Sequence, residues 1–121
     1  MPSRARAPFR AARELVVTQF AVYRNPSSQT KADYPFLLDV QSMLFEDLQT
    51  RVVIPLTRAP ALTKYPLAYL TPTLSLDGEA YLLMTPQLAG IARADLGPQA
   101  GSVADQWKVI LAAVDFLVRG F

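Results

Sequence analysis

The sequence predicts a mainly β fold that ends in one α-helix. Two short apolar runs, at 36–40 and 52–54, are rich in large and β-branched side chains, which is typical of strands. Two further apolar runs flank the dipeptide Asp77-Gly78, which suits a two-residue hairpin turn. From Ser102 onward the spacing of apolar residues changes from about two to about 3.6, and this period predicts a helix.

Composition points to one domain that associates with itself. The chain has 121 residues, enough for a single hydrophobic core. Its residues are 51% hydrophobic and 18% charged, whereas charged residues make up about a quarter of a typical soluble domain. This excess favours a homodimer that covers apolar surface, and a compact monomer with an apolar groove is the alternative. No apolar run reaches the roughly 18 residues that span a membrane, so we expect no membrane partner.

Residue types limit the chemistry that is open to this chain. The chain has no cysteine and no histidine, which removes disulfides, thiolates, the commonest general base and the commonest zinc ligand. It also lacks the glycine-rich phosphate loops and the nucleophile motif of hydrolases. The acids Asp39, Glu46 and Asp47 are interpreted as solvated side chains of a loop, with Arg51 able to pair with them. An acid/base pair or a metal site is the alternative, but no further ligand lies nearby in the sequence. Any catalysis would therefore fall to carboxylates, lysine, arginine, tyrosine or hydroxyl groups, and we predict no metal and no cofactor.

The first residues differ from the remainder. Residues 1–16 contain four arginines, one acid and two prolines, so we expect a basic, disordered N-terminal extension. A flexible tail and a start assigned upstream of the true one are both compatible with this pattern. Weak, non-specific attraction to nucleic acid is the functional alternative. The folded domain is then expected to cover 17–121.

The next segments predict strands joined by exposed connections. Residues 16–24 alternate imperfectly and predict the first strand, and the turn-forming residues 25–33 predict an exposed, mobile loop. In the run 36–40 and just after it, polar side chains are expected to face solvent or a partner. Pro55 is expected to end the second run, and 57–68 to form an irregular connection. The polar side chains expected to face solvent or a partner are those of Asp39, Gln41 and Ser42.

The C-terminal half predicts a hairpin, a strand and the helix. The hairpin covers 69–76 and 79–85, and a strand over 88–96 is expected to stop at Gly97-Pro98. Ser102 is expected to be the helix N-cap. One apolar stripe is expected to pack on the sheet, with the single tryptophan as its anchor: Val103, Trp107, Ile110, Leu111, Val114 and Leu117.

Several short motifs resemble the CcdB family of toxins over residues 17–121. The family pattern has a Gln-Phe pair followed by Tyr, then DVQS, then VIPL at the spacing found here. It also has a Met-Thr pair and a glycine next to the last residue. In this chain these motifs are Gln19-Phe20 with Tyr23, 39–42, 53–56, Met84-Thr85 and Gly120.

The resemblance implies both a fold and a function. The fold would be an SH3-like antiparallel barrel of the CcdB and MazF toxin type, with a long C-terminal helix. The protein would be a homodimeric, non-enzymatic toxin of the bacterial cytoplasm. It would bind the A subunit of DNA gyrase and trap the cleaved-DNA complex, and a CcdA-like antitoxin would neutralise it. DNA would be contacted only indirectly, through the antitoxin or gyrase.

The resemblance also implies two sets of site residues. The family chain ends in a Trp-Gly-Ile tail that enters gyrase, and Arg119, Gly120 and Phe121 occupy those positions here, with arginine in place of the aromatic residue. Asp115 and Leu44 complete the expected gyrase-binding set. The antitoxin-binding or dimer face would contain Gln19, Phe20, Tyr23 and Ser42.

Other interpretations of the same sequence remain open. From the residues alone, 119–121 is a helix C-cap with an arginine that complements the helix dipole. Arg119 at the aromatic position leaves open a relative that binds an antitoxin but no longer poisons gyrase. A ribonuclease toxin of the MazF and Kid type is a further alternative, although it would have to work without histidine.

Overall fold

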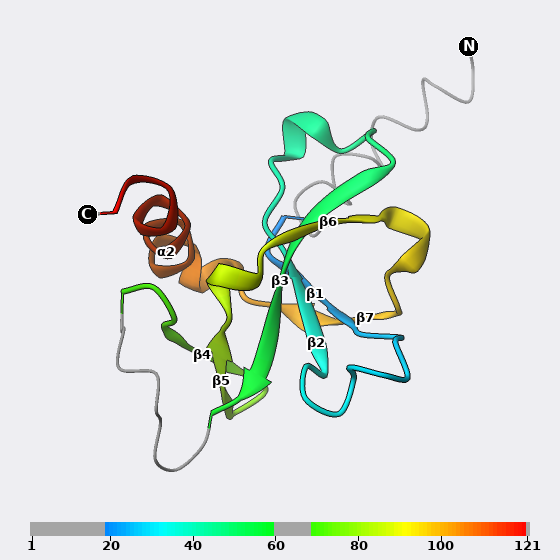
Figure 1. Ribbon diagram of the computed structural model, residues 1–121, viewed down its shortest axis with the longest axis horizontal. Helices are drawn as coiled ribbons and strands as arrows, with labels where there is room; N and C mark the ends of the chain where they lie inside the picture. Colours follow the sequence, from blue (N-terminus) through cyan, green and yellow to red (C-terminus); the bar gives the residue numbers. More distant parts are fainter. Residues whose placement is uncertain (1–18, 60–68, 121) are drawn as a thin grey trace.

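The computed structural model describes residues 19–59 and 69–120 (Figure 1). Within these ranges the chain forms a seven-stranded sheet and one α-helix, α2, over Trp107–Arg119. The strands are β1 (Ala21–Arg24), β2 (Phe36–Asp39), β3 (Thr50–Arg58), β4 (Thr73–Leu76), β5 (Glu79–Leu83), β6 (Ala89–Ala92) and β7 (Gln99–Ser102).

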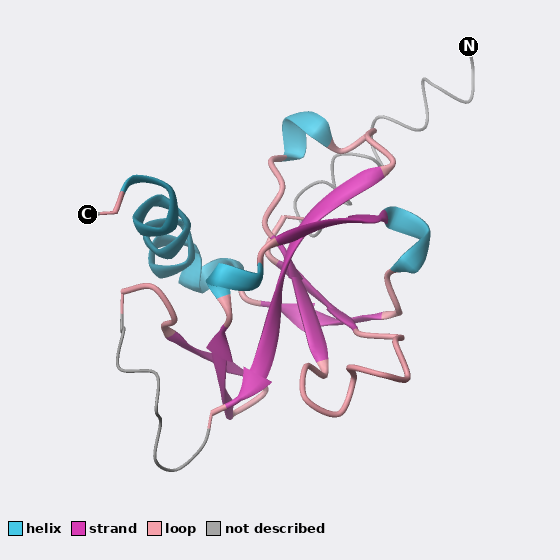
Figure 2. Cartoon of the chain, viewed as in Figure 1, coloured by secondary structure: helices cyan, strands magenta, loops and turns pink. Residues whose placement is uncertain are grey.

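All strand pairs in the sheet are antiparallel, and β3 is its centre. The order is β4-β5-β3-β2-β1-β7, while β6 pairs with the first half of β3. The second half of β3 pairs with β5 instead, so the sheet curls around this long strand into a half-barrel (Figure 2). Helix α2 lies at one side of the curled sheet. The expected SH3-like antiparallel barrel with a C-terminal helix is therefore confirmed.

The core lies inside the curl and is closed by the helix. Strand residues such as Val22, Leu38, Ile54 and Leu83 are fully buried, and Ile110 joins them from α2. Short 3-10 turns lie between these elements: η1 (Met43–Phe45), η2 (Thr85–Gln87), η3 (Arg93–Asp95) and η4 (Ala104–Gln106).

The sequence predicted that Pro55 ends its strand, but the strand continues past this residue. In an antiparallel strand the nitrogen and carbonyl of one residue point to the same side. The Pro55 carbonyl accepts a hydrogen bond from the Met84 amide, 2.9 Å away, in the gap between the β6 and β5 pairings. The missing proline donor therefore costs no ladder bond, and β3 continues to Arg58. The expected irregular connection consequently starts later than position 57, and 60–68 lie outside the described residues.

The hairpin prediction is confirmed, and the strand predicted after it is shorter. Asp77 and Gly78 have φ angles of 53° and 80°, the positive values that a type I′ turn requires. Strand β6 ends at Ala92 and is followed by η3, so 88–96 is not one strand. Strand β7 was not predicted, because its sequence Gln-Ala-Gly-Ser has little apolar content to indicate a strand.

The helix starts later than expected, and only part of the predicted stripe is buried: Val103 and Ile110 lie in the core and Val114 packs against it. Ser102 is not the N-cap of α2, which is Gln106; its Oγ accepts from the Ala104 amide at 3.2 Å, at the start of the 3-10 turn η4. Trp107 is 46% exposed and is not the predicted anchor. Ile110 and Ala113 are the buried residues of α2, because the helix meets the sheet with the side that carries them. Of the predicted stripe, Leu111 and Leu117 are also exposed.

The first loop is exposed, as predicted, and is held by its own side chains. Asn25 Nδ2 donates to Thr30 Oγ1 and to the Tyr34 carbonyl, at 2.9 and 2.8 Å. The Ser27 amide donates to Asn25 Oδ1. Strand β1 begins at Ala21, so the predicted strand 16–24 is shorter in the described part, and 16–18 lie outside it.

Candidate partner-binding site

A cluster of exposed apolar side chains lies on one loop between two strands of the sheet. Residues 42–49 connect β2 to β3 and are called here the apolar loop. Four of its side chains face solvent, with exposed fractions of 40% for Met43, 88% for Leu44, 53% for Phe45 and 53% for Leu48. Ser42 Oγ accepts from the Leu44 amide at 3.1 Å and so begins the turn η1. Apolar side chains held out in this way favour contact with another macromolecule.

A buried ion pair supports this loop from below. Arg51 Nε lies 2.8 Å from Asp39 Oδ2, and the two side chains are 1% and 0% exposed. The other carboxylate oxygen of Asp39 accepts from the Gln41 amide at 2.9 Å. The prediction that Asp39 is a solvated or partner-facing acid is therefore wrong, because Arg51 neutralises it inside the sheet. The predicted pairing with Arg51 is confirmed.

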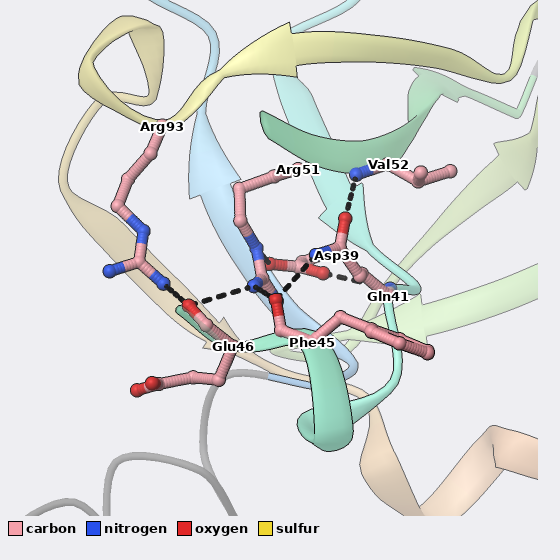
Figure 3. A network of polar contacts seen from close by, with 7 residues as sticks. All are labelled: Asp39, Gln41, Phe45, Glu46, Arg51, Val52 and Arg93. Carbon is pink, nitrogen blue, oxygen red and sulfur yellow. Dashed lines mark hydrogen bonds and ion pairs between the residues drawn. The ribbon is translucent and has the colours of Figure 1, made fainter. Parts of the chain in front are cut away.

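Three side chains hold the backbone carbonyls of the apolar loop (Figure 3). Gln41 Nε2 donates to the Phe45 carbonyl at 2.8 Å, while Gln41 Oε1 accepts from the Val52 amide at 2.9 Å. Arg51 Nη1 lies 3.4 Å from the Phe45 carbonyl and 3.5 Å from that of Glu46. Arg93 Nη2 donates to the same Glu46 carbonyl from η3. The loop is thus tied to β2, β3 and η3.

The other two acids of the loop are not buried with Asp39. Asp47 is exposed and Glu46 is half-buried, so they stay near water, as predicted. In the described residues no group of three or more histidine, cysteine, aspartate or glutamate side chains could hold a metal ion. Asp39, which is buried in the sheet, therefore has a structural role.

The end of α2 forms a second exposed feature. Gly120 has a φ of 79°, and its amide donates to the Phe116 carbonyl at 2.8 Å, which is the left-handed C-cap expected from the sequence. Arg119 Nε lies 3.2 Å from Asp115 Oδ1, and both side chains are more than half exposed. Phe121 lies outside the described residues.

The residues expected at an antitoxin or dimer face lie on β1 and just beyond β2. Gln19, Tyr23 and Ser42 are half-buried. Phe20 is only 8% exposed, and its amide and carbonyl bond to Asp39 and Val103. Phe20 therefore supports this face from the core, and its ring is not on the surface.

Sequence reasoning missed two features. Arg93 gave no sign of a role, because it contacts a loop 47 positions away in the chain. An open groove of about 690 Å³ was also missed, and it is lined by the first loop together with Leu37, Pro55, Ile91 and Leu96. Only the apolar character of 36–40 and 52–54 could have hinted at it.

The strand order and the C-terminal helix define a small half-barrel of the SH3-like class, with a cluster of exposed apolar side chains on one loop. Residues 19–120 match the family model described as CcdB protein, and the chain belongs to the CcdB family. Members of this family are toxins of toxin-antitoxin modules. No protein of curated function matches the chain. Among the described residues, no helix is long and apolar enough to cross a membrane.

Proposed function

We propose that this protein binds the A subunit of DNA gyrase and traps the complex of gyrase with cleaved DNA. Membership of the CcdB family over residues 19–120 is the observation that carries the proposal, since toxins of this family are generally gyrase poisons. The protein acts by binding, with no chemistry of its own. DNA is contacted only through gyrase or the antitoxin, and the site of action is the bacterial cytoplasm.

The gyrase-binding residues proposed are Arg119, Gly120 and Phe121 with Asp115 and Leu44. The exposed helix end and the 88% exposure of Leu44 support this choice. An aromatic anchor in a desolvated pocket commonly contributes about 2–4 kcal/mol, and Arg119 replaces such an anchor here. A guanidinium stacks on aromatic planes and pairs with carboxylates. Arg119 therefore retunes gyrase binding and sets which gyrase is recognised.

The partners proposed are a second copy of the chain and a CcdA-like antitoxin. Gln19, Tyr23 and Ser42 form a face for one of these two partners, the antitoxin or the second copy, with Phe20 beneath it. The toxin domain covers 17–121, and 1–16 is a basic extension outside it.

A growth assay tests the function. The wild-type chain, Arg119→Trp and a chain that lacks 119–121 are expressed in bacteria whose gyrase is of the common type. We expect the tryptophan variant to be the most toxic, and the shortened chain to be harmless although circular dichroism shows it folded. If the folded, shortened chain were as toxic as the wild type, the tail would not be the effector and the gyrase mechanism would be wrong.

A cleavage assay with purified gyrase separates the alternatives. Accumulation of cleaved DNA on addition of the toxin supports poisoning. Arg119 at the aromatic position favours one second candidate, a relative that binds an antitoxin but does not poison gyrase. That candidate predicts no cleaved DNA with the wild type and its appearance with Arg119→Trp.

A further inference from the structure

The loop's own sequence does not explain why the apolar side chains of the apolar loop point outward. Four large apolar side chains in residues 42–49 face solvent, and such a loop would gain by folding them inward. Apart from the bond that the Gln49 carbonyl accepts, its backbone hydrogen bonds stay within the loop: the Phe45 amide donates to Ser42, the Glu46 amide to Met43 and the Leu48 amide to Phe45. Such turns cost little to open. Something outside the loop must hold Leu44 outward.

The side chains that bind the loop differ in whether they can be substituted without disturbing the sheet. Arg51 and Gln41 are buried, and both also stabilise the sheet, through Asp39 and Val52. Arg93 is exposed and belongs to η3, the turn that follows β6 in the chain. Its side chain reaches the Glu46 carbonyl and its amide donates to the Gln49 carbonyl at 2.7 Å. Only the first of these two bonds depends on the arginine side chain.

We propose that Arg93 is a positioning residue, which holds the apolar loop so that Leu44 and Phe45 are presented to gyrase A. The inference rests on the proposed function, because the loop carries one of the proposed gyrase contacts. Arg93 acts through the Glu46 carbonyl and does not itself touch the partner. Its charge-assisted bond is of the stronger class of hydrogen bond, and it fixes the loop before binding.

Two measurements test the proposal on the full-length chain. The first is hydrogen exchange of the Phe45, Glu46 and Leu48 amides in Arg93→Ala, with Arg58→Ala as control. Arg58 is an equally charged, exposed arginine that pairs with Glu79 at 3.5 Å, away from the loop. We expect about tenfold faster exchange of these three amides in Arg93→Ala only, while the strand amides are unchanged. Unchanged exchange in Arg93→Ala overturns the proposal.

The second measurement is a binding cycle with a purified fragment of gyrase A. We expect Arg93→Ala and Leu44→Ala each to weaken binding about tenfold, which corresponds to about 1.4 kcal/mol. If Arg93 acts through the loop, the double variant binds no more than about threefold more weakly than Leu44→Ala alone. If the affinity loss of the double variant equalled the product of the two single losses, Arg93 would contact the partner directly and the positioning role would be wrong.

The two measurements fail independently. A wild-type chain that does not bind the gyrase fragment contradicts the proposed function. The exchange experiment then still decides whether Arg93 holds the loop, because it uses the protein alone.

Discussion

Asp39 and Arg51 form an ion pair that lies inside the sheet, at 2.8 Å between Oδ2 and Nε. The pair joins the last residue of β2 to the second residue of β3, and the apolar loop begins and ends beside it. Arg51 Nη2 is buried and has no hydrogen-bond partner among the described residues. The pair is therefore incompletely satisfied, and a buried pair of this kind contributes little net stability relative to apolar side chains of similar volume.

Removing one member of the buried pair is expected to be costly. Arg51→Met leaves the carboxylate of Asp39 buried without compensation, and we expect the free energy of unfolding to fall by about 3–5 kcal/mol. Denaturant unfolding measures this change. Arg58→Met is the control, because it removes an exposed pair that contributes about 0–1 kcal/mol.

The double variant Asp39→Leu with Arg51→Met separates charge from packing. It removes both charges and keeps an apolar volume, so it is expected to recover most of the lost stability. A double variant as unstable as Arg51→Met would show that the hydrogen bonds of Arg51 to the loop carry the stability instead.

Local patterns predicted the parts of the fold that local forces decide. The turn at Asp77-Gly78 follows from which residues tolerate positive φ, and the C-cap at Gly120 follows in the same way. The burial of Asp39 was not predictable, since it depends on an arginine 12 positions later. The role of Arg93 depends on a contact across 47 positions. The contacts of the site therefore needed the structure, whereas these two backbone turns needed only the local pattern.

The helix shows why only half of the predicted stripe packs on the sheet. Periodicity identified α2, but two overlapping stripes of apolar residues fit the same period. One contains Ile110 and Ala113 and packs on the sheet. The other contains Trp107, Leu111 and Val118 and is exposed. Only tertiary packing decides between two such stripes.

Substitution on each stripe is expected to give different losses of stability. Ile110 is fully buried, so Ile110→Ala should lower the free energy of unfolding by about 2–5 kcal/mol. Trp107 is 46% exposed, so Trp107→Ala should cost the monomer less than about 1 kcal/mol. Denaturant unfolding of both variants, under conditions that keep the protein dilute, compares them. Equal losses would restore Trp107 as a core anchor.

Deletion of residues 1–16 is expected to leave the folded domain intact. These residues carry four arginines against one acid, and the family match begins only at position 19. Segments with such charge and little apolar content contribute little to a core. The melting temperature of the shortened chain should therefore stay within a few degrees of the wild type. A larger loss would mean that the segment packs on the sheet.

The exposed stripe of α2 predicts how two copies associate. Trp107, Leu111 and Val118 are spaced so that they lie along one side of the helix, and their exposed fractions are 46%, 40% and 75%. A second copy that covers this stripe would remove the apolar excess of the composition, and an interface of this kind is the same patch on both copies. We therefore expect sedimentation at micromolar concentration to give about twice 13.3 kDa.

A charge on the stripe tests this arrangement against any other dimer. Leu111→Glu places a carboxylate in the expected interface, where burying an unpaired charge is costly, so we expect a folded monomer. Ala112→Glu is the matched control, because Ala112 is exposed and lies about 100° further around the helix, off the stripe. It should sediment as the wild type does.

A dimer that survives Leu111→Glu would place the interface elsewhere, with the face of Gln19, Tyr23 and Ser42 as the next to be substituted. A wild-type monomer would instead leave the stripe free for a different protein and contradict the homodimer.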